Sequence, residues 1–337
     1  MMAADPSLAG IPASDAAGVG GVRPSTGSRR CGDRAQEEVL SLAKIAVVGA
    51  GLMGVGIAHA FASSGHDVCL IDVSSEQLGK AEKTIAGILA DGVRLGKVEE
   101  SAAAEALARL TTSGSVTEGA AGADLLVETV SENLAIKIEV VRMAETVMAP
   151  TGLIATNTSA LSVTEIAAAC QDPTRVIGMH FFNPVQKMKL VELVRGLATT
   201  DEAVAACRDY VAGLGKTAIV VNETPGLTTS RMSAMAGNEA MWMLQEGAAT
   251  AEDIDTALRL GFNHPMGPLE LGDLTGWDTR LAVLQYLHAT LGDKFRPCPL
   301  IIKMVKAGRY GRKVGWGVYK YENGVKLPGS GLRGSNL

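Results

Sequence analysis

Residues 49–54 hold three glycines, spaced G-x-G-x-x-G, directly after a short run of mostly β-branched residues at 45–48. In this pattern a buried strand leads through a tight turn into a helix. We expect Gly49 to permit the turn and Gly51 to let backbone N–H groups approach a pyrophosphate. Gly54 would let the helix pack closely on the sheet. The pattern therefore predicts a wound α/β sheet that binds a dinucleotide at this turn.

The next predicted strand ends in an acidic residue, Asp72, which indicates the kind of dinucleotide. A carboxylate there accepts hydrogen bonds from an adenosine ribose and repels a 2′-phosphate. No Lys or Arg follows at 73–75, so the sequence predicts NAD and not NADP as the cofactor. The residues expected to bind its pyrophosphate are Gly49, Ala50, Gly51, Leu52, Met53 and Gly54.

The composition is that of an ordinary globular protein, with 47% hydrophobic and 20% charged residues. The uncharged run 45–62 is long enough to span a bilayer, but a strand, a glycine turn and a buried helix explain it better. A net charge of −5 gives no reason to expect a nucleic acid or a membrane as partner. The five cysteines lack paired spacing, which favours reduced thiols and a cytoplasmic location. No metal site is expected.

Apolar runs alternate with helical stretches or turns and predict the strands of the sheet, with helices on both of its faces. They cover residues 44–48, 67–72, 124–128, 152–156, 175–181, 189–194 and 216–221. After Pro225 and Gly226 the strands stop and helices follow. These helices are expected over residues 227–247, 251–260, 277–291 and 299–307.

The chain is expected to divide into a Rossmann-type NAD-binding domain over 43–222 and a helical domain over 223–323, followed by a flexible tail over 324–337. Residues 1–42 are rich in Ala, Gly, Ser and Pro and predict a disordered extension. Its arginines leave organellar targeting open. A wrongly assigned start, upstream of a chain that begins near Val39, explains the segment equally well.

One of only five histidines, His180, stands in the apolar run GMHFF, and Glu192 follows on the next apolar run. Most histidines on apolar strands are satisfied core residues, and this alternative stays open. However, two domains with a dinucleotide site predict a dehydrogenase, which needs a base for the proton of the substrate hydroxyl. A hairpin through 183–189 would return Glu192 beside His180, where a carboxylate stabilises the imidazolium. The two residues form a candidate catalytic pair.

Polar residues also follow two other predicted strands, at the edge of the sheet where ligands of such folds bind. In TNTSALS, residues 156–162, Ser162 with Glu165 predicts a capping box, which leaves Asn157, Thr158 and Ser159 free. VETVSENLAIK supplies further polar side chains, which are either helix-start residues or cofactor contacts. They are Glu132, Asn133 and Lys137.

From Lys44 to Tyr321 the sequence resembles the short-chain L-3-hydroxyacyl-CoA dehydrogenases, most closely the bacterial 3-hydroxybutyryl-CoA dehydrogenases. The resemblance is carried by GAGLMGVGIA, VSENLAIK, TNTSALS, GMHFFNPVQKMKLVEL, TPGL, NEAMWMLQEGAATAEDIDTALRLGFNHPMGPLEL and GRKVGWGVYKY. It implies an NAD-binding domain followed by an all-α dimerisation domain, and hence a homodimer with the active site between the two domains. Its members catalyse one step of fatty-acid, butyrate and related metabolism.

The resemblance also implies roles for particular residues. His180 is the base, Glu192 orients it, and Ser159 contacts both cofactor and substrate. Residues matching the cofactor site are Glu132, Lys137, Asn183 and Lys313. The expected reaction is reversible oxidation of an L-3-hydroxyacyl-CoA, the four-carbon substrate above all, with NAD.

Two departures from the family pattern concern the substrate. PGFxxNR of the family reads PGLTTSR here, which replaces Asn by Ser230 and Phe by Leu227. We expect Ser230, with Ser159, to hydrogen-bond the C3 oxygen or the thioester. The family's CoA-binding Ser and Lys have no clear counterparts, and the nearby cations are Lys83, Arg94 and Lys97. Two alternatives stay open: a dehydrogenase of a free hydroxy acid, and an NAD-binding structural or sensing protein without turnover.

Overall fold

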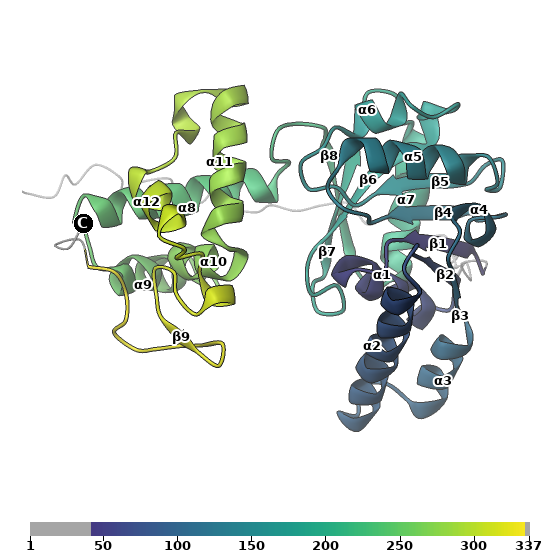
Figure 1. Cartoon of the computed structure of the whole chain (residues 1–337), viewed down its shortest axis with the longest axis horizontal. Helices are drawn as coiled ribbons and strands as arrows, with labels where there is room; N and C mark the ends of the chain where they lie inside the picture. The colour runs from purple at the N-terminus through teal and green to yellow at the C-terminus, as the bar shows by residue number, and fades with distance from the viewer. Residues whose placement is uncertain (1–41, 334–337) are drawn as a thin grey trace, which may run out of the picture. The chain divides into compact units, whose positions relative to one another are not determined.

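The computed structural model describes residues 42–333, so the predicted disordered extension lies, apart from Leu42, outside the described residues. Within that range the first part of the chain is built on an eight-stranded sheet in the order β3-β2-β1-β4-β5-β6-β7-β8 (Figure 1). The strands are β1 Lys44–Val48, β2 Asp67–Ile71, β3 Leu110–Ser113, β4 Leu125–Glu128, β5 Leu153–Thr156, β6 Val176–Phe181, β7 Leu190–Arg195 and β8 Thr217–Asn222.

Strands β1 to β6 are parallel, β7 runs antiparallel to β6, and β8 is parallel to β7. The predicted strands are all present within a residue or two of their expected bounds. The structure has one further strand in this sheet, β3, which the sequence did not predict. Its residues, LTTS, are exposed or half-buried on the sheet edge, and so they form no apolar run.

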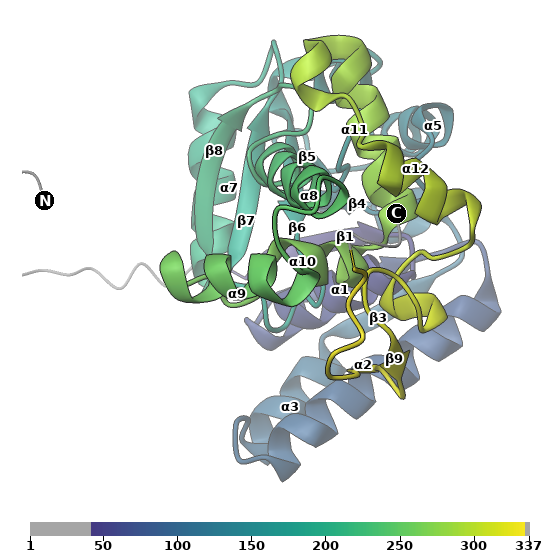
Figure 2. The same ribbon diagram turned by 90° about the vertical axis from the view of Figure 1, so that its left-hand side faces the viewer.

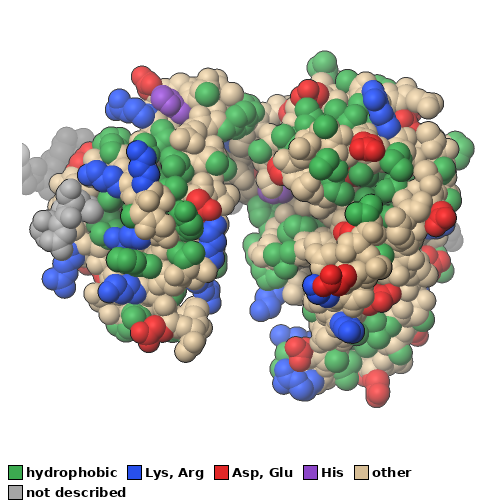
Figure 3. All heavy atoms as spheres, in the orientation of Figure 1, with side chains coloured by type: hydrophobic (Ala, Val, Ile, Leu, Met, Phe, Trp, Pro, Cys, Tyr) green, Lys and Arg blue, Asp and Glu red, His purple; other side chains and the backbone are tan. Residues whose placement is uncertain are grey.

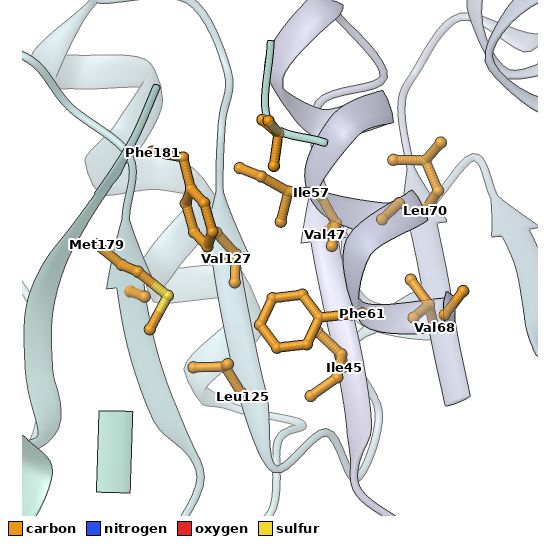
Figure 4. Close-up of a cluster of buried hydrophobic side chains, with 14 of the residues drawn as sticks. Ile45, Val47, Ile57, Phe61, Val68, Leu70, Leu125, Val127, Met179 and Phe181 are labelled. Atoms are coloured by element: carbon orange, nitrogen blue, oxygen red, sulfur yellow. The ribbon is translucent and has the colours of Figure 1, made fainter. Parts of the chain in front are cut away.

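Alternation along the strands divides the apolar side chains between the two faces of the sheet. Ile45 and Val47 of β1 belong to one buried cluster, and Ala46 and Val48 belong to the other. The first cluster is completed by α1, α2, α3 and α7, and Figure 4 shows Phe61 of α1 lying against the sheet there. The second is completed by α4, α5 and α6. Helices therefore cover both faces, as the sequence predicts.

The helices of this part begin at side-chain caps in most cases. Ser74, Ser115, Asn133, Ser162 and Thr200 each accept a hydrogen bond from a backbone N–H of the first turn that follows. The bounds are α1 Leu52–Ser63, α2 Ser75–Arg94, α3 Glu100–Ala108, α4 Val116–Gly119, α5 Leu134–Glu145, α6 Val163–Ala167, the 3₁₀ turn η1 Pro173–Arg175, and α7 Asp201–Gly213. Asn133 thus caps α5, which agrees with the helix-start alternative.

The helical part packs α9, α10, α11 and α12 around α8 (Figure 2). Its helices are α8 Thr229–Gln245, α9 Ala251–Gly261, α10 Pro268–Thr275, α11 Trp277–Leu291 and α12 Pro299–Lys306, with 3₁₀ turns η2 Asp293–Phe295 and η3 Arg312–Val314. The four predicted helices are present, and α10 was not predicted. Trp277, Phe295 and Tyr319 are fully or almost fully buried in its separate core.

Two buried carboxylates tie the last described segment to this core. Asp273 accepts hydrogen bonds from the Trp277 indole (2.6 Å) and from the backbone of Val318 (2.7 Å) and Tyr319 (2.8 Å). Asp255 accepts one from the Tyr319 hydroxyl (2.7 Å). Because both carboxylates are buried, their lone pairs must be satisfied from within the protein. Residues near 320 are therefore an integral part of the helical core.

A short hairpin, β9 Tyr321–Glu322 with β10 Val325–Lys326, follows that segment. Lys326 pairs with Glu270, and the Gly331 amide donates to Glu252 at 2.9 Å. A domain boundary after residue 323, as expected from the sequence, falls inside this hairpin. Residues 324–333, which we expected to be flexible, make these contacts in the structure, whereas 334–337 lie outside the described range.

Candidate active site

The antiparallel register of β6 and β7 places His180 directly opposite Glu192. His180 Nδ1 and Glu192 Oε2 are 2.8 Å apart, and both side chains are buried. The hairpin predicted from the sequence thus forms and brings the two residues together. The His180 ring also packs against Phe182, with 4.7 Å between ring centroids.

Glu192 has no exposed surface, and its carboxylate is satisfied by three hydrogen bonds. Besides His180, it accepts the Thr229 backbone N–H at Oε1 (3.0 Å) and the Thr229 hydroxyl at Oε2 (3.1 Å). Burial would raise the pKa of Glu192, but these bonds from His180 and Thr229 outweigh it and hold the pKa below its usual range. Glu192 is therefore a carboxylate, which fixes the proton of neutral His180 on Nδ1.

Ser159 lies at the other side of the imidazole. Its Oγ is 3.2 Å from His180 Nε2. Because Nδ1 donates to Glu192, Nε2 is the acceptor and the Ser159 hydroxyl donates to it. Nε2 therefore has a lone pair directed at the loop after β5, where it can accept a proton from a substrate hydroxyl.

Glu132 organises the loop that carries Ser159. Its Oε1 accepts hydrogen bonds from the Thr158 hydroxyl (2.5 Å) and from the backbone N–H of Ser159 (3.0 Å) and Ala160 (3.2 Å). Burial opposes ionisation, but the Thr158 hydrogen bond and the Lys137 charge, with the backbone bonds, lower the pKa of Glu132. The carboxylate expected to line the cofactor site thus also supports the position of Ser159.

Lys137, another residue expected to line the cofactor site, is buried beneath it with 1% of its surface exposed. Its Nζ lies 2.9 Å and 3.0 Å from the two carboxylate oxygens of Glu128 and 3.4 Å from Glu132 Oε2. Glu128 also accepts the Thr156 hydroxyl at 2.7 Å. Lys137 therefore supports the position of Glu132 through an ion pair. Glu128 was not predicted as part of the site, because it is the last residue of an apolar strand.

A serine, a histidine and a carboxylate in line are also the arrangement of serine hydrolases, which need backbone N–H groups to stabilise an oxyanion. Here the amides of Ser159 itself and of the next residue, Ala160, both donate to Glu132. A negative carboxylate occupies the donors that an oxyanion would need. The local geometry therefore favours proton transfer by His180 over attack by Ser159.

The glycine turn between β1 and α1 fits a bound dinucleotide. Gly49 has φ +104°, and a Cβ at Gly54 would lie 1.8 Å from the Gly49 carbonyl oxygen. A Cβ at Gly51 would meet no atom within 4 Å, so this side of the turn is open to a ligand. The first turn of α1 has neither a side-chain cap nor an acidic residue, and its N–H groups and dipole are available to an anion.

Asp72 closes the turn from the end of β2. Its carboxylate accepts the Ala50 N–H at 2.8 Å and the Ser74 N–H at 2.9 Å, so it is fixed beside the glycines. Each oxygen retains a further lone pair for a ribose hydroxyl. The next side chain, Val73, is 92% exposed and brings no positive charge for a 2′-phosphate.

The remaining predicted residues lie in different places. Asn157 accepts the Phe181 N–H at 2.8 Å and so joins the Ser159 loop to the end of β6. Asn183 follows that strand and precedes a cis peptide bond to Pro184. Ser230 is half-buried in the first turn of α8, next to Thr229. Lys313 lies in the helical part, where its Nζ is 2.6 Å from Asp278 Oδ2.

The three candidate CoA-binding cations, Lys83, Arg94 and Lys97, are exposed on α2 or just after it, and Arg94 pairs with Asp91. A pocket of about 570 Å³ adjoins Ser159 and extends past Leu161, Val194 and Leu227. Within residues 42–333 no helix has both the length and the apolar character required to cross a bilayer.

An open glycine turn, an acid after β2, and a buried His–Glu pair beside a serine together define a nicotinamide-dependent dehydrogenase with a helical second domain. Comparison with known families agrees: residues 44–224 match the 3-hydroxyacyl-CoA dehydrogenase NAD binding domain, and residues 226–321 match the C-terminal domain of the same family. The chain belongs to the 3-hydroxyacyl-CoA dehydrogenase family, and NAD is its cofactor.

Individual relatives cover most of the described chain. A 3-hydroxybutyryl-CoA dehydrogenase of Bradyrhizobium diazoefficiens is 43% identical over 286 residues, which are 85% of this chain and 97% of that protein. A probable 3-hydroxybutyryl-CoA dehydrogenase of Bacillus subtilis is 43% identical over 284 residues, which are 84% and 99% of the two chains. The crystal structure of (S)-3-hydroxybutyryl-CoA dehydrogenase from Ralstonia eutropha matches with TM-score 0.81 and 41% identity, over 84% of this chain and all of that one.

The environment of Asp72 predicts a strong preference for NADH over NADPH. In the double variant Asp72→Ala with Val73→Arg, the ratio of kcat/KM for NADH to that for NADPH should fall by about tenfold or more, because a repulsive charge is lost and a phosphate partner is gained. The single variant Val73→Ala, which changes only an exposed side chain, should leave the ratio unaltered. Equal use of both cofactors by the unmodified enzyme would contradict the assignment.

Proposed function

We propose that the protein oxidises L-3-hydroxyacyl-CoA reversibly to 3-ketoacyl-CoA with NAD, and that its preferred substrate is 3-hydroxybutyryl-CoA. The observation that carries this proposal is the continuous line from Ser159 Oγ through the His180 ring to Glu192, with distances of 3.2 Å and 2.8 Å. Membership of the family supports the reaction. The names of the Bradyrhizobium and Ralstonia relatives support the four-carbon acyl group.

In this reaction His180 is the base. Its Nε2 accepts the proton of the C3 hydroxyl, and the buried Glu192 carboxylate stabilises the imidazolium that forms. When substrate binds, the Ser159 hydroxyl gives up its hydrogen bond to His180 Nε2 and donates to the C3 oxygen instead. Bound NAD supplies the acceptor for the hydride from C3. In the reverse direction protonated His180 returns the proton to the 3-keto oxygen.

We also assign Ser230 to the substrate site. It is the second residue of α8, directly after Thr229, whose contacts hold this turn against Glu192. Its hydroxyl would hydrogen-bond the C3 oxygen or the thioester carbonyl, where the family pattern has the longer Asn side chain. The pocket beside Ser159 is lined by Gly226 and Leu227, which shortly precede this turn in the chain.

Absorbance of NADH tests the reaction directly. Acetoacetyl-CoA should cause rapid loss of NADH absorbance, whereas free acetoacetate and a reaction without substrate should not. Rapid turnover of free acetoacetate would indicate a dehydrogenase of free hydroxy acids. If NADH binds but neither compound is reduced, the protein is an NAD-binding protein without this activity.

Removal of the base tests its role separately from folding. His180→Ala should lower kcat by at least ~100-fold, the usual contribution of general acid–base catalysis, with little change in NADH affinity. Glu192→Gln should also be severely impaired, because the amide is neutral and its NH₂ group would face one of the donors on His180 and Thr229. His288→Ala, on α11 and distant in sequence from the site, is the control. A folded His180→Ala enzyme with near-normal kcat would make His180 an ordinary core residue.

We further propose that the protein is a cytoplasmic homodimer formed through its helical domain. The support is a set of exposed large hydrophobic side chains on that domain: Met232, Met235, Leu260, Phe262, Leu274, Tyr286, Val314 and Trp316. Figure 3 shows hydrophobic side chains between Lys and Arg side chains on its visible face. Sedimentation equilibrium should give about twice the chain mass of 34.9 kDa, and a single-chain mass at micromolar concentration would exclude the dimer.

A further inference from the structure

Thr229 contacts the catalytic carboxylate twice, although the family pattern leaves its position unspecified. It is the third residue of LTTSR, at the start of α8, and is half-buried. The backbone N–H donates to Glu192 Oε1 at 3.0 Å, and the hydroxyl donates to Glu192 Oε2 at 3.1 Å. Any residue at this position supplies the first bond, but only a hydroxyl side chain supplies the second.

The second bond matters because it ends on the oxygen that His180 uses. Glu192 Oε2 accepts both His180 Nδ1 at 2.8 Å and Thr229 Oγ1 at 3.1 Å. Two donors on one oxygen share its negative charge, so each weakens the other. They also fix the carboxylate plane, since Oε1 is held separately by the backbone.

We propose that Thr229 is a positioning residue for the base: its hydroxyl directs Glu192 Oε2 at His180 and reduces the proton affinity of the Glu192–His180 pair. Thr229 itself does not touch the substrate in this proposal. The inference rests on the proposed function, because it concerns the same proton transfer. It adds that part of the tuning of the base comes from the helical domain.

The surroundings of the pair support this assignment. From β6 only His180 contacts the carboxylate, and from β8 the residue opposite Glu192 is Ile219. On α8 the nearest charged residue, Arg231, stacks over Phe295 at 5.7 Å. Glu132 reaches the far side of the imidazole through the Ser159 loop, and Glu223 is bound by Thr164. Among the described hydrogen bonds of Glu192, the Thr229 hydroxyl is thus the neutral donor that shares the Oε2 atom with His180.

Thr229→Val removes the hydroxyl at almost constant shape and retains the backbone bond. The pair should then take up its proton at higher pH, whichever of its two members carries that proton. The acidic limb of the pH profile of kcat/KM for oxidation of 3-hydroxybutyryl-CoA should therefore shift upward by about half a pH unit, equivalent to loss of part of one hydrogen bond. Thr229→Ser, which restores a hydroxyl, should return the limb towards its original position.

Thr228→Val is the matched control, because Thr228 is exposed in the same turn and its side chain caps nothing. It should leave the profile unchanged. A hydroxyl that serves only folding would alter the melting temperature of Thr229→Val without moving the limb, and that result would overturn the proposal. A limb that moves to lower pH would overturn it too. The unmodified enzyme's turnover of acetoacetyl-CoA tests the proposed reaction independently of both outcomes.

Discussion

The antiparallel pairing of β6 with β7 is the constraint on which the active site depends. All other neighbouring strands in the sheet are parallel to each other. Two neighbouring parallel strands need a long crossover connection between them, whereas an antiparallel pair can be joined by a short hairpin. Reversal of direction lets His180 and Glu192, only twelve residues apart, face each other in one register pair. A slip by one residue would turn Glu192 to the other face. The buried apolar neighbours on both strands prevent that slip, so packing of the sheet also positions the base.

The parts of the fold that the sequence predicted are those set by local pattern. Apolar runs gave the strands because both faces of the sheet are covered and central strands are apolar throughout. The glycine turn was recognisable because Gly49 and Gly54 meet neighbouring backbone that no Cβ could approach. His180 and Glu192 could be paired in advance because one short hairpin separates them. Edge strand β3 failed the same test, since Thr111 and Thr112 are exposed.

The parts that escaped prediction depend on contacts between distant residues. Thr229 is 37 residues from Glu192, and nothing in LTTSR indicates where its hydroxyl points. The sequence leaves Lys137 as either a helix-start residue or a cofactor contact, and it does not show that the Lys137 ammonium pairs with Glu128 in the interior. The burial of a charged side chain can be predicted only when the oppositely charged residue that pairs with it is known. The pairing of Lys313 with Asp278 is likewise not evident from the sequence, and the cofactor role that the resemblance implies for Lys313 stays a prediction.

The buried Asp273 has a consequence for synthesis of the chain on the ribosome. The strands of the sheet end at Asn222, so the NAD-binding half has all of its core residues long before synthesis is complete. Asp273, in contrast, needs the amides of Val318 and Tyr319, which are translated some forty-five residues later. Domains generally fold as units and in order of synthesis. The nucleotide-binding half would therefore fold first on the ribosome. Glu192 would then lack its hydrogen bonds from Thr229 until the helical part has folded.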